Sequence, residues 1–200
     1  DEAVELAANK SVVLRVLSND SDIEGQDISL KLNSVEFNGA AGAVTATQNA
    51  DGTITITPDP NHALFVDLAK NAAAAVQTIS YTVQDTEGGE TDGQVNLTVL
   101  GVEGPPVAGD DTAQVTEGGS VVVDVLANDT DKDNDDLTVL TPTAGQYGTT
   151  ALNADGTITY NASASTLESL AVGQHLTDTF DYSITDGTNF TDATVTVTIT

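Results

Sequence analysis

The chain repeats one pattern twice, and this duplication constrains its fold more than any other feature. DEAVELAANKSVVLRVLSNDSD at residues 1–22 aligns without a gap with DDTAQVTEGGSVVVDVLANDTD at residues 110–131. Further along, ISYTVQD at residues 79–85 aligns with FDYSITD at residues 180–186. Self-similarity at a fixed spacing indicates a repeat architecture, and about 100 residues per copy is a common domain size. The sequence therefore predicts two homologous domains.

A short connector joins the two copies. Residues 100–111 read LGVEGPPVAGDD, in which Pro105 and Pro106 restrict the backbone to an extended path and remove two N–H donors. Such a segment is semi-rigid rather than freely flexible. We place the two domains at 1–103 and 104–200.

Within each copy, apolar and polar residues alternate. In SVVVDVL, Val121, Val123 and Val125 share one face, while Val122 and Asp124 share the other. Aromatic residues make up only 4% of the chain, so the core depends on aliphatic and β-branched residues, which favour strands. About seven such strands per copy, separated by Asp-Gly and Gly-Gly turns, predict an all-β fold of two antiparallel β-sandwiches.

The charge of the chain limits its partners. With 31 acidic and five basic residues the net charge is −26, which disfavours nucleic acid and anionic membranes and suits cations. The absence of cysteine excludes disulfides, zinc–thiolate sites and thiol nucleophiles. No apolar run approaches the ~18 residues needed to span a bilayer, so we expect no membrane insertion.

The second copy contains the densest group of carboxylates, NDTDKDNDDL at residues 128–137. In a seven-stranded sandwich, the N-terminus, the loop after the second strand and the hairpin before the last strand share one end. Converging carboxylates repel one another, and Ca²⁺ relieves this by taking six to eight oxygen ligands. We predict a Ca²⁺ site formed by Asp110, Asp111, Asn128, Asp129, Asp131, Asp133, Asp135 and Asp186, with Glu103 of the connector.

The first copy repeats this pattern less completely. Its corresponding ligands would be Asp1, Asn19, Asp20, Asp22, Glu24, Asp27 and Asp85. An EF-hand is excluded, because positions six and twelve of the second-copy loop are Asn134 and Leu140 rather than Gly and Glu. The alternative for either loop is a solvated acidic surface without a bound ion.

The second copy also resembles a known family. The resemblance is carried by DVLANDTDKDNDDL, DGTITY, LESLAVGQHLTDTFDYSITDG and TVTVTI, together with Pro106, Ala108, Asp110, Asp111 and Glu117. These motifs resemble the cadherin-like and VCBS-type tandem repeats of large bacterial adhesins. The resemblance implies Ig-like, cadherin-like sandwiches in a secreted protein, often of the RTX class exported by type I secretion. It also implies that neighbouring repeats of the same chain are partners.

The leading interpretation is therefore a structural extender of a bacterial surface adhesin. Ca²⁺ at the interdomain junction would stiffen the chain for cell adhesion and biofilm attachment. The alternative is a carbohydrate- or protein-binding module, although only Phe65, Tyr147 and Phe190 offer aromatic rings for stacking on a ligand. An enzyme is not expected, because the carboxylates lie in duplicated loops without an insertion large enough to form a substrate pocket.

Overall fold

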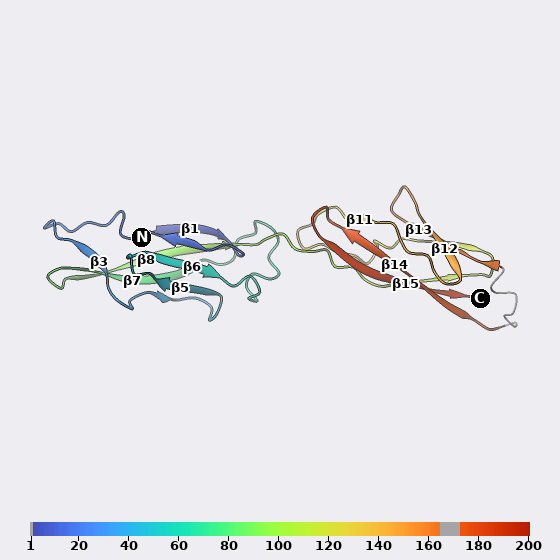
Figure 1. Cartoon of the computed structure of the whole chain (residues 1–200), viewed down its shortest axis with the longest axis horizontal. Coiled ribbons are helices and arrows are strands. Elements are labelled where there is room, and N and C mark those ends of the chain that lie inside the picture. Colours follow the sequence, from blue (N-terminus) through green and yellow to red (C-terminus); the bar gives the residue numbers. More distant parts are fainter. Residues whose placement is uncertain (1, 165–172) are drawn as a thin grey trace. The chain divides into compact units, whose positions relative to one another are not determined.

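The computed structural model describes residues 2–164 and 173–200, which form two compact units (Figure 1). Unit 1 comprises Asp1–Glu103 and unit 2 comprises Gly104–Thr200. In the part of the chain that is described, no helix has the length and apolarity required to cross a membrane.

Unit 1 is a sandwich of two sheets. One sheet has the order β1-β8-β7-β3 with β4 also paired to β7, and the other has the order β2-β6-β5. The strands are β1 (Glu2–Ala7), β2 (Val12–Leu14), β3 (Ile28–Leu30), β4 (Glu36–Phe37), β5 (Val44–Gln48), β6 (Ile54–Pro58), β7 (Gln77–Asp85) and β8 (Glu90–Leu100).

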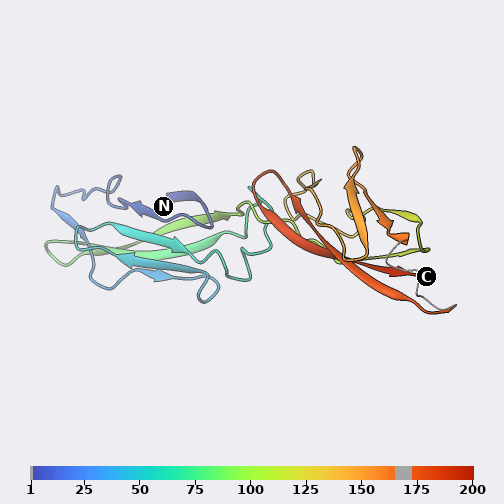
Figure 2. The ribbon, with the colours of Figure 1, turned by 45° about the vertical axis from the view of Figure 1, so that its right-hand side comes forward.

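Unit 2 repeats this arrangement with one strand fewer. Its sheets have the orders β11-β14-β15-β9 and β10-β13-β12. The strands are β9 (Asp111–Val115), β10 (Ser120–Val123), β11 (Thr138–Val139), β12 (Gly148–Leu152), β13 (Ile158–Ala162), β14 (Leu176–Thr185) and β15 (Phe190–Ile199). The long hairpin of β14 and β15, orange to red in Figure 2, runs the length of this unit.

Apart from β4, each strand of unit 1 has a counterpart in unit 2, which confirms the prediction of two β-sandwiches. In each unit the first strand pairs in parallel with the last: Glu2 lies opposite Val95 in unit 1, and Asp111 lies opposite Val195 in unit 2. The other pairings between named strands are antiparallel, so the parallel pair is the one departure from the predicted strand directions. This pairing brings the start of each unit beside its longest hairpin.

Each unit buries its own core, as the alternating pattern predicted. In β14 the inward residues Phe180, Tyr182 and Ile184 are at most 2% exposed, while the outward Asp181 is exposed. The rings of Tyr160 and Phe180 stack with centroids 5.9 Å apart. Burial of such side chains contributes roughly 1.5–3 kcal/mol each to folding.

A buried carboxylate distinguishes unit 2 from unit 1. Asp178 is 3% exposed, and it accepts hydrogen bonds from the amides of Gln146, Tyr147 and Thr179 and from the hydroxyl of Tyr160. Burial and the neighbouring Asp178 raise the pKa of Tyr160, so this hydroxyl stays protonated and donates. At the matching position of unit 1, Gln77 accepts from Ala40 and donates to Ala75.

Candidate metal centre

The acidic loop of unit 2 follows β10 and is folded by its own carboxylates. Asp131 Oδ1 accepts a hydrogen bond from the backbone N–H of Asp133 at 2.7 Å, which forms an Asx turn. Asn134 then adopts a left-handed φ of 60°, a conformation that Asn tolerates better than most residues. The turn brings carboxylate oxygens of Asp133 and Asp135 within 4.8 Å of each other.

Residues 104–109, which we term the connector segment, run along this loop. Val107 and Thr130 exchange two backbone hydrogen bonds of 2.7 and 3.0 Å. The N–H of Gly104 donates to Asp133 Oδ2, and the N–H of Gly109 donates to Asp129 Oδ1, both at 2.8 Å. The connector segment therefore supplies donors to the acidic loop at two points on either side of a short β-bridge.

The hairpin between β14 and β15 holds the other side of the connector segment. Asn189 Nδ2 donates to the carbonyl of Gly104 at 3.2 Å, and Thr191 Oγ1 donates to the carbonyl of Pro106 at 2.6 Å. The Tyr182 hydroxyl lies 3.1 Å from the carbonyl oxygen of Gly109. Three segments thus meet at one end of unit 2, as the strand order of a sandwich predicted.

Two of the predicted ligands also organise the backbone around them. Asn128 Nδ2 donates to the carbonyl of Asp110 at 3.1 Å, and Asp110 Oδ1 accepts from the N–H of Thr194 at 2.9 Å. A Cβ added to Gly109 would lie 2.6 Å from Asn128 Nδ2, so only glycine fits this approach without a shift of the Asn128 side chain. These contacts fix the start of β9 against the acidic loop.

Asp186 of unit 2 and Asp85 of unit 1 cap their own hairpins. Asp186 Oδ1 accepts from the N–H groups of Thr188 and Asn189, both at 2.6 Å, and these bonds lower its pKa. Asp85 Oδ1 accepts two N–H groups of its turn at 2.7 and 2.9 Å, which likewise lower its pKa. Both carboxylates are therefore charged and already hydrogen-bonded within the hairpin.

The electrostatics at the connector segment are unfavourable for unneutralised carboxylates. Burial raises the pKa of Asp111, the hydrogen bond from Tyr182 opposes this, and nearby Asp129, Asp110 and Asp124 raise it further. Burial also raises the pKa of Asp129, against the opposing hydrogen bond from Gly109. The centre accordingly gathers negative charge in a partly desolvated position, where a cation would stabilise it.

Two oxygens in this centre fit a hard cation directly. Asp129 Oδ2 and Asp131 Oδ2 are buried, and neither accepts a hydrogen bond from any described residue. A buried carboxylate oxygen without a donor is costly, and a divalent cation is one way to satisfy it. Asp133 and Asp135 offer two further carboxylates in the same loop, and a donor set of oxygen alone would match Ca²⁺.

The matching loop of unit 1 builds the same turn with a different charge pattern. Asp22 Oδ1 accepts from the N–H groups of Glu24 and Gln26 at 2.7 and 3.2 Å. Gln26 occupies the position of Asp135, and its buried Oε1 accepts no hydrogen bond from the described residues. Asp20 and Asp27 are exposed. Within the described part of unit 1, no three carboxylates offer oxygens within 4.8 Å of one another.

Two further predicted ligands are Glu103 and Asp1. Glu103 forms a salt bridge with Lys70 and directly precedes Gly104, whose N–H donates to Asp133. Asp1 lies outside the described residues. Sequence reasoning missed Asn189 and Thr191, because polar residues in a Thr-rich hairpin carry no signal that they hold a distant backbone segment.

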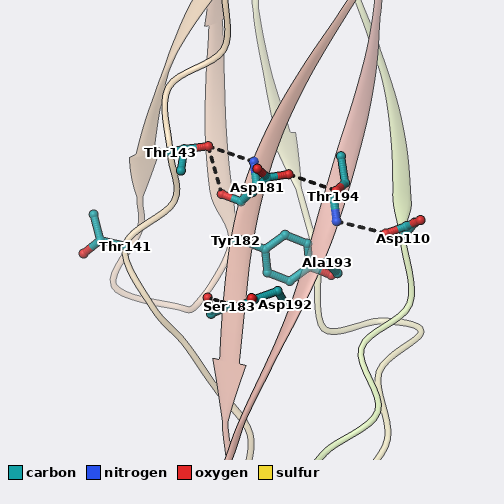
Figure 3. Close-up of a pocket in the computed structure, with 9 residues that line it drawn as sticks. All are labelled: Asp110, Thr141, Thr143, Asp181, Tyr182, Ser183, Asp192, Ala193 and Thr194. Carbon is teal, nitrogen blue, oxygen red and sulfur yellow. Dashed lines mark hydrogen bonds between the residues drawn. The ribbon is translucent and has the colours of Figure 1, made fainter.

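A shallow groove of about 370 Å³ lies on the outer face of β14 and β15 in unit 2 (Figure 3). Its carboxylates pair with hydroxyls across the strands: Thr194 Oγ1 donates to Asp181 at 2.9 Å, and Ser183 Oγ donates to Asp192 at 2.6 Å. Thr143 borders the groove and bonds the backbone of Asp181. The lining is polar and acidic.

Comparison with protein families covers nearly the whole chain. The model of the bacterial Ig domain matches residues 1–98, and the model of the bacterial cadherin-like domain matches residues 103–200. A curated protein of Rhizobium johnstonii, the calcium-binding lectin RapA2, is 29% identical over 205 residues, covering 90% of this chain and 85% of the lectin.

Solved structures give weaker likenesses. Domains EC1-3 of mouse clustered protocadherin PcdhgC3 align with a TM-score of 0.49 and 14% identity, over 100% of this chain and 64% of that one. Domains EC1-2 of human mucin-like protocadherin align with a TM-score of 0.41 and 18% identity, over 100% of this chain and 95% of that one. The endo-fucoidan hydrolase MfFcnA4 aligns with a TM-score of 0.33 and 17% identity, over 99% of this chain but only 27% of the hydrolase. With TM-scores below 0.5, these likenesses support no conclusion about fold or function.

Proposed function

Because residues 1–98 belong to the bacterial Ig-domain family and residues 103–200 to the bacterial cadherin-like family, we propose that the chain is a calcium-binding, non-catalytic adhesion module. The observation that carries this proposal is the pair of buried oxygens Asp129 Oδ2 and Asp131 Oδ2, which have no hydrogen-bond partner among the described residues. The relative of this chain in Rhizobium johnstonii is named a calcium-binding lectin, which supports the proposal of an ion at this centre.

The ligands of the proposed ion divide into two groups. Asp129, Asp131, Asp133 and Asp135 provide side-chain oxygens from the acidic loop, and Asp111 provides a fifth carboxylate that burial already destabilises. Calcium supplies the positive charge that this group lacks. Asp110, Asn128 and Asp186 hold the surrounding backbone through the hydrogen bonds described above, and they complete the proposed set.

Glu103, the last residue of unit 1, is the remaining ligand that we propose. It precedes Gly104 by one peptide bond, and the N–H of Gly104 donates to the ligand Asp133 at 2.8 Å. A Glu103 oxygen bound to the same ion would fix the last residue of unit 1 to the acidic loop of unit 2. Calcium would thereby stiffen the connection, as an extender requires.

In unit 1 the proposed ligands are Asp1, Asn19, Asp20, Asp22, Glu24, Asp27 and Asp85. Replacement of an aspartate by Gln26 removes one charge from this set, so we propose that it binds calcium more weakly than unit 2. Extracellular modules bind Ca²⁺ at roughly 10⁻⁴–10⁻³ M, so both sites would fill outside the cell and remain largely unfilled in a low-calcium cytosol.

The proposed setting is the surface of a bacterium. There the module would connect neighbouring repeats of a large secreted adhesin, exported by type I secretion, and support attachment in biofilms. The acidic surface, with a net charge of −26, suits calcium-rich surroundings.

Small-angle scattering tests the extender proposal. The purified chain is measured in EDTA and then in excess CaCl₂, with MgCl₂ as the ionic control. We expect calcium to narrow the distribution of interdomain distances and to raise the melting temperature. An unchanged distance distribution together with an unchanged melting temperature would contradict the proposal.

A second candidate function is glycan binding. The name of the lectin relative favours it, and the groove of Figure 3 offers hydroxyl and carboxylate groups that could bond sugar hydroxyls. A glycan array probed with the chain in calcium tests this candidate. Binding that is lost in Asp181→Ala would support it, whereas no signal on any glycan would leave only the extender function.

A further inference from the structure

An open cleft lies at the acidic end of unit 1. It has a volume of about 530 Å³ and is lined by residues 19–22 of the acidic loop, by the end of β7 and by residues 89–93. Ile28 and Val83 contribute apolar surface, while Asp20, Asp22 and Asp85 contribute carboxylates. The cleft is therefore lined by both apolar side chains and carboxylates.

The matching region of unit 2 holds the connector segment. Thr130, which matches Ser21, is bonded twice to Val107. Thr191 lies opposite Ile184 of β14, just as Thr91 lies opposite Val83 of β7. The Thr191 hydroxyl donates to the carbonyl of Pro106. The same three structural elements that leave a cleft in unit 1 thus contact an extended segment in unit 2.

Three features of unit 1 indicate that such a segment is needed. The backbone of Ser21 makes no hydrogen bond to the described residues, whereas Thr130 makes two. The side chain of Ile23 is 101% exposed. Its counterpart Lys132 instead packs against the connector segment, since a Cβ added to Gly104 would lie 2.2 Å from Lys132 Cε. Val83 is only partly buried, whereas the matching Ile184 is 0% exposed.

We propose that the cleft of unit 1 is a docking site for an extended segment attached immediately before Asp1. The duplication fixes the register, because Val107 lies three residues before Asp110, which matches Asp1. The third residue before Asp1 pairs with Ser21 through two backbone hydrogen bonds and therefore is not proline. The residue just before Asp1 is small, since Gly109 occupies that position against Asn128.

The recognition is that of an added β-strand. Main-chain hydrogen bonds supply affinity, and the apolar side chains Ile23 and Val83 are covered at the same time. The counterpart in unit 2, GPPVAG at residues 104–109, is uncharged, so docking of a segment like it does not require a bound ion. Docking goes beyond the proposed calcium function, and it can succeed or fail independently of it.

The test uses the full chain with GPPVAG added before Asp1, compared with the chain as it stands. Amide hydrogen exchange is followed at Ser21, with Thr130 as the internal reference, in EDTA and in CaCl₂. We expect the added segment to slow exchange at Ser21 by about tenfold or more, as cooperative backbone pairing does elsewhere. The matched control is GPPPAG, in which proline removes the N–H that would donate to the Ser21 carbonyl, and there the protection should be weaker.

Two outcomes would overturn the proposal. One is unchanged exchange at Ser21 in both buffers while Thr130 remains protected. The other is protection that grows with protein concentration, which would mean that a second molecule supplies the segment. Calcium titration of the same samples separates the two proposals: bound calcium without protection at Ser21 refutes docking alone, and protection without bound calcium refutes the metal centre alone.

Discussion

The two acidic loops begin from the same local design and end in different environments. Asp22 and Asp131 form equivalent turns, each accepting the N–H of the residue two positions later at 2.7 Å. Asp129 is nevertheless partly buried beneath the connector segment, whereas its counterpart Asp20 is exposed. A short acidic motif therefore builds a turn, and a segment from elsewhere in the chain turns it into a partly desolvated centre.

The largest expected difference between the units concerns their buried polar residues. Asp178→Ala leaves the donors of Gln146, Tyr147 and Tyr160 without their acceptor, which should lower the free energy of unfolding of unit 2 by about 3–5 kcal/mol. Gln77→Ala removes fewer hydrogen bonds and should lower the free energy of unfolding of unit 1 by a smaller amount. Native-state exchange of amides in β14 and β7 measures both, and equal losses would contradict the distinction.

The next effect separates the loops by their response to calcium. At about 100 times the dissociation constant, an ion stabilises its site by about 2.7 kcal/mol. Asp129→Asn with Asp131→Asn should abolish this gain in unit 2, because Asn keeps the turn but loses the charge. The matched pair Asp20→Asn with Asp22→Asn should leave the gain in unit 2 intact. Chemical denaturation with and without calcium decides this, and equal losses in both pairs would contradict the assignment.

A smaller effect concerns the packing of the two equivalent tyrosines. An added Cβ on Gly93 would lie 2.4 Å from the Tyr81 ring, whereas the matching position opposite Tyr182 already holds Ala193. Gly93→Ala should therefore destabilise unit 1 by about 1–3 kcal/mol through overpacking. A melting temperature of unit 1 that stayed constant would show that the ring moves aside freely.

The smallest effect is a pH dependence with opposite signs in the two calcium states. The pKa values of Asp111 and Asp129 are raised, so the folded calcium-free unit binds more protons than the unfolded chain above about pH 4. Its free energy of unfolding should rise as pH falls from neutral toward that value. With calcium, protons compete with the ion and stability should fall. Urea titrations at pH 7 and 5 measure the free energy of unfolding in both calcium states. The double variant Asp111→Asn and Asp129→Asn is the control for general charge effects.

The fold was largely predictable because its causes are local. Alternation in SVVVDVL and TFDYSIT predicts strands with one buried face, and the repeated sequence predicts two similar sandwiches. The parallel pairing of β1 with β8 was not predicted, since alternation gives no information about strand direction. The convergence of three segments at one end of unit 2 followed from strand order.

The candidate centre was less predictable, because burial depends on contacts between distant segments. The spacing of Asp129 and Asp131 indicated calcium, but only the structure shows that each has one buried oxygen to which no described residue donates a hydrogen bond. Asp186 looks like an equal ligand in the sequence, yet its oxygens serve its own hairpin. The connector segment contacts the acidic loop through backbone N–H groups. Nearly every residue has such a group, so the sequence does not indicate which of them bind the loop.

A crystal structure of the chain grown in CaCl₂ would show directly whether the acidic loop of unit 2 binds calcium. We expect an ion bound to Asp129 Oδ2 and Asp131 Oδ2, at the distances of about 2.3–2.6 Å typical of calcium and oxygen. Well-ordered loops in which both oxygens instead bond only to water or protein, with no ion within reach, would contradict it.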